Sequence, residues 1–301
     1  MRVGAIDLGT NSTRLLVADV ADGRVEEVAR ALRITRLGEG VDERRRLLPL
    51  PVARVRNVLT DFRRELDRLG AERTLAVGTS AVRDADNGEA FLGEIEWSYG
   101  FATRLLSGDE EAALTFRGVT ARRTLPPGTL IVDVGGGSTE LILDGRAISL
   151  DVGCVRLTER FGDDRDTAAG YVRRSLPAVD VGAAIGVAGT ITSLAALDLG
   201  LADYDSERIH GHRLGLSAAE DQLARLAALP LDERRRVPGL DPERAPVIVA
   251  GAVVLVEILR RYGLDEIEVS EHDLLHGVAL AAAELAAPAE GHAPPGAFTC
   301  C

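Results

Sequence analysis

Apolar residues along this chain follow two spacings, one typical of β-strands and one typical of α-helices. Residues 5–17 and 131–143 each contain an apolar run ending in Asp, a glycine-rich turn and a second apolar run, which is the pattern of a β-hairpin. Residues 52–69 instead carry apolar side chains at helical intervals. Further strands are predicted at residues 25–33, 74–77, 102–106, 147–152, 184–187 and 266–269, and further helices at 89–99, 110–122, 218–229, 246–262 and 273–286. This alternation predicts an α/β fold with a mixed sheet in each half of the chain.

The two hairpins are copies of one pattern. At a constant offset of 126 positions, Asp7 matches Asp133 and Gly9 matches Gly135, and three later positions are also identical. A single Asp-x-Gly turn is ordinary turn chemistry, since both residue types are common turn formers. Two matched copies within similar apolar flanks indicate a duplicated domain.

A strong turn signal, Leu-Pro-Pro-Gly at residues 125–128, separates the two copies. We therefore expect an N-terminal domain at residues 1–124 and a C-terminal domain at 125–287, with the last helix as a candidate to pack back on the first domain. Residues 288–301 are rich in Ala, Pro and Gly, which predicts a disordered tail. The cysteines are Cys154, Cys300 and Cys301, and their spacing fits neither a disulfide framework nor a metal site.

Both glycine-rich turns suit a phosphate group. Glycine lets backbone N–H groups approach phosphate oxygens without an intervening Cβ, and hydroxyl and amide side chains add donors. The candidate phosphate-binding residues of the two turns are Thr10, Asn11, Ser12, Gly135, Gly136, Gly137 and Ser138. Asp7 and Asp133 end their strands facing the turns, and such oxygen ligands suit Mg²⁺ bound beside phosphates. Two hairpins from two domains would form a clamp around a chain of phosphates.

Composition narrows the classes of function. The 301-residue chain is 46% hydrophobic and 27% charged, as in an ordinary globular protein, and its formal net charge is −12. This acidity argues against general nucleic-acid binding, which relies on basic contacts to phosphates. The sequence contains no lysine, which excludes a Walker A loop and a protein-kinase strand lysine. The chain begins on a strand pattern and has no apolar run of roughly 18 residues, so we expect a cytoplasmic protein with no membrane partner.

Five ordered motifs carry a family resemblance. They are I-D-L-G-T-N-S-T-R at residues 6–14, G-T-S-A-V-R-D-A-D-N at 78–87, L-S-G-D-E-E-A at 106–112, V-D-V-G-G-G-S-T-E at 132–140 and G-V-A-G-T at 186–190. Together they resemble the exopolyphosphatase / guanosine pentaphosphate phosphohydrolase (Ppx/GppA) family, over roughly residues 1–285. The resemblance implies two actin/hexokinase-like (ribonuclease H-like) domains, each a mixed sheet flanked by helices, with the active site in the interdomain cleft. One departure is His276, which stands where the family often has an acidic residue.

Hydrolysis of a phosphoanhydride needs a positioned water, a base for its proton and neutralisation of the phosphoryl charge. The resemblance places the catalytic glutamate at Glu111. Spacing alone does not choose among Asp109, Glu110 and Glu111, because carboxylates in a first helical turn also complement the helix dipole, and Glu110 is the main rival. The resemblance also favours Arg83 as a phosphate ligand, because the planar guanidinium fork suits phosphate oxygens.

Arg14 and Glu140 stand at matching positions of the two repeats. If the hairpins face each other, strand alternation points both side chains into the cleft, with Arg14 on phosphate and Glu140 on metal or water. The alternative for each is a surface position on a strand edge. The predicted metal ligands are Asp133, Glu140 and Asp7, for Mg²⁺ or Mn²⁺, with a monovalent cation as a further candidate.

The favoured function is an exopolyphosphatase, in which a metal ion and a water activated by a glutamate release terminal phosphate from inorganic polyphosphate. The alternatives are a guanosine pentaphosphate phosphohydrolase, a small-molecule kinase of the same superfamily, and a non-catalytic polyphosphate or nucleotide sensor. The expected partners are polyphosphate or guanosine pentaphosphate and, by resemblance, a second copy of the chain in a homodimer.

Several other polar residues are assigned structural roles. His210 and His212 have no convincing third metal ligand nearby, so a structural or substrate-loop role is expected for them, and Cys154 is expected to be a small packed residue. The arginine runs at 44–46 and 234–236 are expected on solvated faces, with contact to a long polyanion as the alternative. The G-V-A-G-T motif stands where a strand meets a helix, which suits anion binding and tight packing equally.

Overall fold

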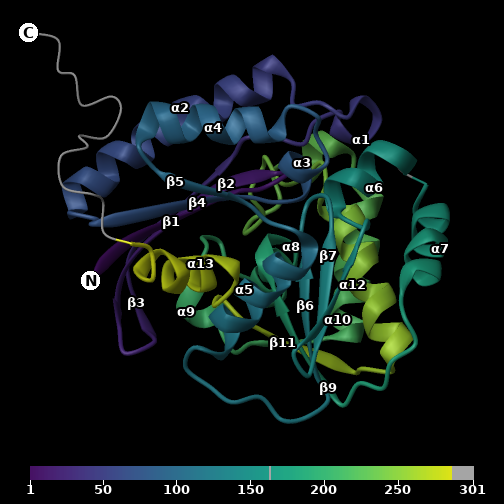
Figure 1. The fold of residues 1–301 in the computed structure, drawn as a ribbon. Helices are drawn as coiled ribbons and strands as arrows, with labels where there is room; N and C mark the ends of the chain where they lie inside the picture. The colour runs from purple at the N-terminus through teal and green to yellow at the C-terminus, as the bar shows by residue number, and fades with distance from the viewer. Residues whose placement is uncertain (163, 287–301) are drawn as a thin grey trace, which may run out of the picture. The chain divides into compact units, whose positions relative to one another are not determined.

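The computed structural model describes residues 1–162 and 164–286. The chain divides into two compact units: unit 1 contains residues 1–123 and the segment from Leu274 on, and unit 2 contains residues 124–273. Figure 1 shows the elements of both units. The predicted tail at 288–301, with Cys300 and Cys301, lies outside the described residues.

Unit 1 is built on a five-stranded mixed sheet with the order β3-β2-β1-β4-β5. Its strands are β1 (Arg2–Leu8), β2 (Ser12–Ala21), β3 (Arg24–Ile34), β4 (Arg73–Gly78) and β5 (Ala102–Leu105). The first three form an antiparallel meander, whereas β4 and β5 extend the sheet in parallel with β1. Its helices are α1 (Val41–Arg44), α2 (Pro49–Leu69), α3 (Ser80–Arg83), α4 (Gly88–Tyr99), α5 (Gly108–Thr120) and α13 (Leu274–Ala283).

Strand alternation gives this sheet two apolar faces. Ile6 and Leu15 belong to a core formed with α2 and α4, whereas Val3 and Leu16 belong to a second core formed with α5 and α13. Figure 1 shows α2 and α4 on one side of the strands and α5 and α13 on the other. The strand that carries Asp7 is therefore buried on both faces, and only its end leads into a turn.

Close helix contacts fix α13 against unit 1. A Cβ at Gly277 would lie 1.9 Å from the carbonyl oxygen of Leu114, so α13 approaches α5 more closely than any other residue type would allow. At the far end of α13, Arg117 of α5 pairs with Glu284 at 2.7 Å. These contacts hold α5, whose first turn carries Glu111, against the sheet.

Unit 2 is built on a six-stranded mixed sheet with the order β10-β11-β9-β6-β7-β8. Its strands are β6 (Thr129–Val134), β7 (Thr139–Leu143), β8 (Arg146–Leu150), β9 (Ala183–Val187), β10 (Arg213–Gly215) and β11 (Glu266–Val269). Its helices are α6 (Cys154–Phe161), α7 (Arg165–Ser175), α8 (Ala188–Asp198), α9 (Ser206–Ile209), α10 (Leu216–Ala228), α11 (Leu231–Arg234) and α12 (Ile248–Tyr262). The strongly apolar α12 contacts α6, α7, α8 and α10, and so forms the centre of the helical packing.

The sequence repeat is a structural repeat. The run β8-β7-β6-β9-β11 in unit 2 has the same order and pairing directions as β3-β2-β1-β4-β5 in unit 1. The hairpin registers also match, because Asp7 pairs with Arg14 as Asp133 pairs with Glu140. Asp133 follows Asp7, and Glu140 follows Arg14, by the same offset of 126 positions that the sequence shows. The predicted α/β class with a mixed sheet in each half is confirmed.

Two details differ from the expectations. Arg234 does not lie on a solvated face: it is buried, and its guanidinium donates to the carbonyl groups of Leu226, Leu229 and Ala245. Strand β10 was not expected, because three residues are too few to show an alternating pattern. No helix in the described parts of the chain is long and apolar enough to cross a membrane.

Candidate functional site

The turn between β1 and β2 has its carbonyl groups fixed on one side. Backbone N–H groups of residues 35 and 36 donate to the carbonyl oxygen of Asn11 at 3.1 and 2.9 Å, and that of residue 38 donates to the carbonyl oxygen of Thr10 at 2.8 Å. In a trans peptide the carbonyl and the following N–H point in opposite directions, so the N–H groups of Asn11 and Ser12 face away from that segment. The buried Nδ2 of Asn11 also has no hydrogen-bond partner in the described residues. These donors suit an anionic ligand.

The turn between β6 and β7 closes in the same way as the first. The N–H of Gly135 donates to the carbonyl of Ser138 at 3.0 Å, as the N–H of Gly9 donates to Ser12 at 3.0 Å. A Cβ on either glycine would lie 2.9 Å from the serine carbonyl, which explains the glycine at both positions.

Helix α6 fixes the carbonyl groups of this second turn. The N–H of Cys154 donates to the carbonyl of Gly135 at 3.0 Å, and the N–H of Val155 donates to that of Gly136 at 2.8 Å. A Cβ on Gly153 would lie 2.4 Å from the carbonyl oxygen of Gly136, so the helix can approach the turn only because residue 153 is glycine.

In the hairpin β1–β2, the negative charge of Asp7 at the end of β1 is neutralised by Arg14 of β2. Arg14, directly opposite Asp7 in the register, donates from Nε to Asp7 Oδ2 at 2.8 Å and also places Nη2 at 2.8 Å from the same oxygen. Asp7 is only 4% exposed, so this ion pair is largely shielded from water. One oxygen of the predicted metal ligand Asp7 is thereby committed to arginine.

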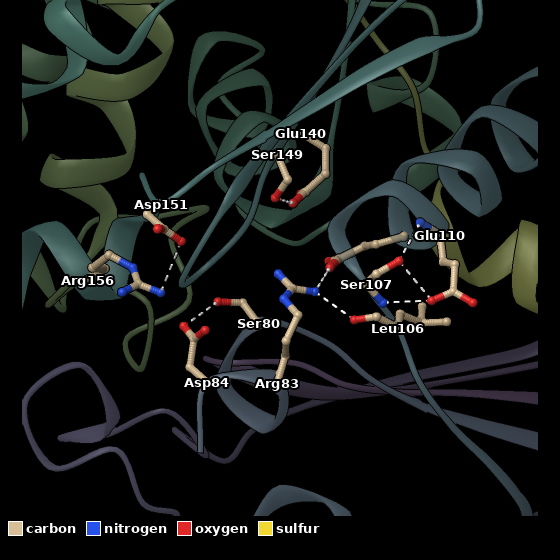
Figure 2. Close-up of polar contacts among 11 residues, drawn as sticks. Ser80, Arg83, Asp84, Leu106, Ser107, Glu110, Glu140, Ser149, Asp151 and Arg156 are labelled. Atoms are coloured by element: carbon tan, nitrogen blue, oxygen red, sulfur yellow. Dashed lines mark hydrogen bonds and ion pairs between the residues drawn. The ribbon is translucent and has the colours of Figure 1, made fainter. Parts of the chain in front are cut away.

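The second hairpin carries two acids at the equivalent positions. Asp133 and Glu140 are opposite one another in the register and are 6% and 1% exposed. Residues that pair across two strands lie on the same face, where like charges repel. The hydroxyl of Ser149 donates to Glu140 Oε1 at 2.8 Å and so orients this carboxylate, as Figure 2 shows. Two neighbouring carboxylates in a buried setting form a set of oxygen donors suited to a divalent cation.

Glu111 and Arg83 form an ion pair in unit 1. Glu111 lies in the first turn of α5 and is 7% exposed, and its Oε2 accepts from Arg83 Nη1 at 3.1 Å. The same Nη1 donates to the carbonyl of Leu106 at 2.8 Å, which fixes the arginine against the end of β5 (Figure 2). The arrangement holds a buried carboxylate at a helix N-terminus.

Glu110 has a different role from its neighbour. Its Oε2 accepts from the backbone N–H and from the hydroxyl of Ser107, both at 2.8 Å, and Ser107 in turn caps the N–H of Glu110. This is a capping box, which Figure 2 shows beside Arg83. The two hydrogen bonds from Ser107 lower the pKa of the Glu110 carboxyl below its usual value. An exposed carboxylate used in this way is a poor proton acceptor.

No group of three or more His, Cys, Asp or Glu side chains able to hold a metal occurs within residues 1–162 and 164–286. The pair Asp133 and Glu140 nevertheless fits a magnesium ion, because Mg²⁺ usually binds through one or two carboxylates together with waters and substrate phosphates. His212 is engaged elsewhere, with Nε2 at 2.7 Å from Asp198 Oδ2. Nδ1 of His210 accepts from the N–H of Glu271 at 3.2 Å, a structural contact and so one of the two roles expected for these histidines.

The G-V-A-G-T motif joins β9 to α8. Gly189 is packed under the guanidinium of Arg244, since a Cβ there would lie 2.4 Å from two of its nitrogens. Ala188 has a φ of 69°, in the left-handed region that few residues other than glycine adopt. Cys154 lies nearby and is buried, and burial raises the pKa of its thiol, so it is the packed residue that the sequence predicts.

The structure brings the predicted residues together in pairs within each unit. Unit 1 contains the phosphate-binding candidates Thr10, Asn11, Ser12, Arg14 and Arg83, with Asp7 and Glu111; unit 2 contains Gly135, Gly136, Gly137 and Ser138, with Asp133 and Glu140. The sequence interpretation missed Ser149, which orients Glu140, and Arg156, which contacts the second turn. Ser149 faces Glu140 across the hairpin β7–β8, and the two-residue Asp-Gly turn at 144–145 is a sequence signal for that register. No spacing rule joins Arg156 to the carbonyl of Gly137.

Comparisons with known proteins agree with these features. Residues 16–285 match the model of the Ppx/GppA phosphatase family. Exopolyphosphatase 2 of Mycobacterium tuberculosis is 39% identical, with 94% of this chain and 98% of that protein covered. A guanosine-5'-triphosphate,3'-diphosphate pyrophosphatase of Vibrio vulnificus is 31% identical, over 91% of this chain and 58% of that protein. The crystal structure of the Aquifex aeolicus member of the Ppx/GppA family superposes with a TM-score of 0.78 at 30% identity, covering 93% of this chain and 97% of that one.

Proposed function

Because the chain belongs to the Ppx/GppA phosphatase family, we propose that it is an exopolyphosphatase that hydrolyses the terminal phosphoanhydride bond of inorganic polyphosphate. The observation that carries the proposal is on the hairpin β6–β7. There a buried pair of carboxylates, Asp133 and Glu140, adjoins a glycine-rich turn. The first residues of α6 bind carbonyl groups of this turn, so the N–H groups that follow them point away from the helix. A cation site directly beside a set of amide donors is what a metal-bound phosphate needs.

Glu111 is the proposed base. Water that attacks a terminal phosphoryl group must lose a proton, and a carboxylate held in place can accept it. Glu111 is buried and anchored by Arg83, whereas Glu110 is occupied by the capping box. These contacts support Glu111 over Glu110, the alternative that the sequence left open.

The arginines are proposed to neutralise substrate charge. Arg83 fixes Glu111 through one nitrogen, and its remaining N–H groups suit phosphate oxygens. Arg14 is proposed to contact phosphate while it stays paired with Asp7. The hydroxyl and amide donors of Thr10, Asn11, Ser12 and Ser138 would complete the binding of successive phosphates.

Asp133 and Glu140 are the proposed ligands of Mg²⁺ or Mn²⁺, with Asp7 as a weaker candidate because Arg14 occupies one of its oxygens. A bound divalent ion would neutralise charge that develops on the phosphoryl oxygens. Ser149 would orient the Glu140 carboxylate for that ion, in the way that outer hydrogen bonds orient metal ligands. A homodimer in the cytoplasm completes the proposal. The homodimer rests on the family resemblance, and the cytoplasmic location rests on the sequence pattern described above.

The test is an assay of phosphate release. Purified protein with Mg²⁺ is incubated with medium-chain polyphosphate, with guanosine pentaphosphate, and with ATP in the presence of sugars. We expect orthophosphate from polyphosphate at a kcat/KM above that for guanosine pentaphosphate. Faster release from guanosine pentaphosphate would favour the second family activity, sugar phosphorylation would favour the kinase, and binding without release from any substrate would favour the sensor.

A further inference from the structure

Three consecutive peptide planes of the second turn are held in one orientation. The N–H groups of Cys154 and Val155 hold the carbonyls of Gly135 and Gly136, as described above. The third carbonyl, that of Gly137, accepts from the side chain of Arg156, whose Nε lies 2.7 Å away. All three carbonyl groups therefore point toward the start of α6.

This orientation determines where the turn's donors point. No peptide bond in the described residues is cis, so each carbonyl is opposed by the N–H of the next residue. The N–H groups of Gly136, Gly137 and Ser138 thus face away from α6. None of the three donates to a protein acceptor in the described residues. Three adjacent N–H groups that point the same way form an anion-binding nest.

Arg156 is buried at the position where its side chain makes this contact. It is 7% exposed, although arginine is rarely buried, and its own backbone N–H also donates to Gly136 at 3.2 Å. Its Nη2 lies 3.8 Å from a carboxylate oxygen of the exposed Asp151 (Figure 2). Burial and the hydrogen bond from Nε restrain this guanidinium beside the turn, and the pairing with Asp151 adds little because that carboxylate is exposed.

The three peptides differ in what holds them. Backbone N–H groups of a helix hold the first two carbonyls, and they cannot be lost without unwinding α6. The third carbonyl accepts its hydrogen bond from the side chain of Arg156, so this peptide is the one that a single substitution would release. If that peptide turned over, the Gly137 carbonyl would face the substrate in place of the Ser138 N–H, and a carbonyl oxygen repels phosphate.

We propose that Arg156 is a positioning residue that fixes the peptide between Gly137 and Ser138, so that three N–H groups of the turn bind a phosphate of the substrate. Arg156 itself does not touch the substrate. The proposal rests on the proposed function for the identity of the substrate, but the nest would bind any phosphate group.

The experiment compares Arg156→Ala with Arg160→Ala. Arg160 is a matched control because it lies on the same helix, is exposed and contacts Tyr171 rather than the turn. Loss of one charge-assisted hydrogen bond predicts a kcat/KM for polyphosphate about 10- to 100-fold lower in Arg156→Ala. Arg160→Ala should keep the wild-type value. Adding guanidinium ion at millimolar concentration should restore part of the activity to Arg156→Ala and none to wild type, since the ion can occupy the vacated space. A folded Arg156→Ala protein with wild-type kcat/KM would overturn the proposal.

A second measurement separates this inference from the proposed function. In protein labelled with ¹⁵N-glycine, the amide signals of Gly136 and Gly137 should shift when orthophosphate or triphosphate is titrated. The shifts should need about tenfold more ligand or more in Arg156→Ala and be unchanged in Arg160→Ala. If wild type hydrolyses no phosphoanhydride but shows this difference, the function fails and the role of Arg156 stands. If the Gly136 and Gly137 signals respond equally in wild type and variant, the role of Arg156 fails.

Should Arg156→Ala not fold, Arg156→Lys replaces it in both experiments. This variant keeps a cation but loses the Nε–H, so the same direction of change is expected.

Discussion

The hairpins β1–β2 and β6–β7 have the same register and the same turn closure, yet they differ in charge. At the paired strand ends unit 1 has Asp7 with Arg14, and unit 2 has Asp133 with Glu140. One residue at one repeat position turns a self-neutralised pair into a pair of acids. The first hairpin needs no added ion to bury its carboxylate, whereas the second gains from a bound cation.

The two turns also differ in what holds them. A backbone segment, residues 35–38, fixes the first turn, while a helix N-terminus and the side chain of Arg156 fix the second. The duplicated scaffold therefore keeps its backbone geometry, while single side chains give the two copies different charges and different contacts. Unit 1 carries the proposed base and the proposed phosphate-binding arginines, and unit 2 carries the proposed metal ligands.

The strongest test of this division is Glu111→Gln. The substitution keeps the size and the contact to Arg83 but removes the proton acceptor, so kcat should fall by about 10²- to 10⁴-fold. The Kd for polyphosphate, measured on the same protein by isothermal titration, should stay within a few-fold of wild type. A variant that retains full turnover would show that the base lies elsewhere, and the division of work between the units would have to be redrawn.

The next largest effect is expected at Arg14, where the self-neutralised pair can be broken. Arg14→Met leaves the carboxylate of Asp7 buried without its cation, which should lower the free energy of unfolding by about 3 kcal/mol. Arg2→Met is the matched control on the same hairpin, because Arg2 of β1 pairs with Asp19 of β2 at 2.8 Å where both side chains are well exposed. Such a surface pair is worth less than about 1 kcal/mol. Chemical denaturation followed by circular dichroism measures the free energy of unfolding of the two variants. Equal decreases in this free energy would contradict the inference that the hairpin β1–β2 depends on Arg14.

The equivalent position of the second hairpin gives the complementary test. Glu140→Gln removes one of two proposed metal ligands, so activity at a fixed Mg²⁺ concentration should fall by about 10- to 100-fold. Mg²⁺ should raise the Tm of wild type, since an ion that binds only the folded state stabilises it, and should do so less in the variant. Glu140→Arg gives unit 2 the charge pattern of unit 1. This variant should fold, and Mg²⁺ should no longer raise its Tm. An unchanged Mg²⁺ response in Glu140→Arg would place the metal site away from this hairpin.

The regular part of this fold could be predicted from the sequence because its signals are local. The matched hairpins and the amphipathic α2 follow from apolar spacing over a few residues, and both occur where that spacing indicates. The buried Arg234 could not be predicted, because arginine runs usually lie in water and its carbonyl partners come from a fold-dependent contact. Arg156 was missed for the same reason, because only the folded chain brings it near Gly137. Ser149 could have been found, since the Asp-Gly turn at 144–145 sets the register that pairs it with Glu140.

The sequence placed three acids in one helical turn but could not separate them, because the helix dipole favours a carboxylate at each position. Side-chain contacts separate them. Glu110 turns back to Ser107, and Glu111 turns inward to Arg83. The distinction depends on the direction in which each side chain leaves the helix, and that is set by packing of α5 on the sheet and on α13.

The smallest predicted effect tests this separation through pH. The contacts from Ser107 lower the pKa of Glu110 in the folded protein below that in the unfolded chain. The ionised carboxylate therefore stabilises the folded state fully at pH values above the unfolded-state pKa. This contribution is lost as the pH falls through the lower pKa of the folded state. Glu110→Gln should therefore cost about 0.5–1 kcal/mol of stability at neutral pH, with the difference from wild type vanishing in acid, because the group is exposed and the cap is a modest one. Its kcat should stay within about twofold of wild type, since Glu110 supplies a cap and no proton transfer. The measurement is a set of denaturation curves from neutral to acidic pH beside a kcat determination. A Glu110→Gln protein with unchanged stability and a greatly reduced kcat would reverse the roles of the two glutamates, since the capping residue would then be the one that serves the reaction.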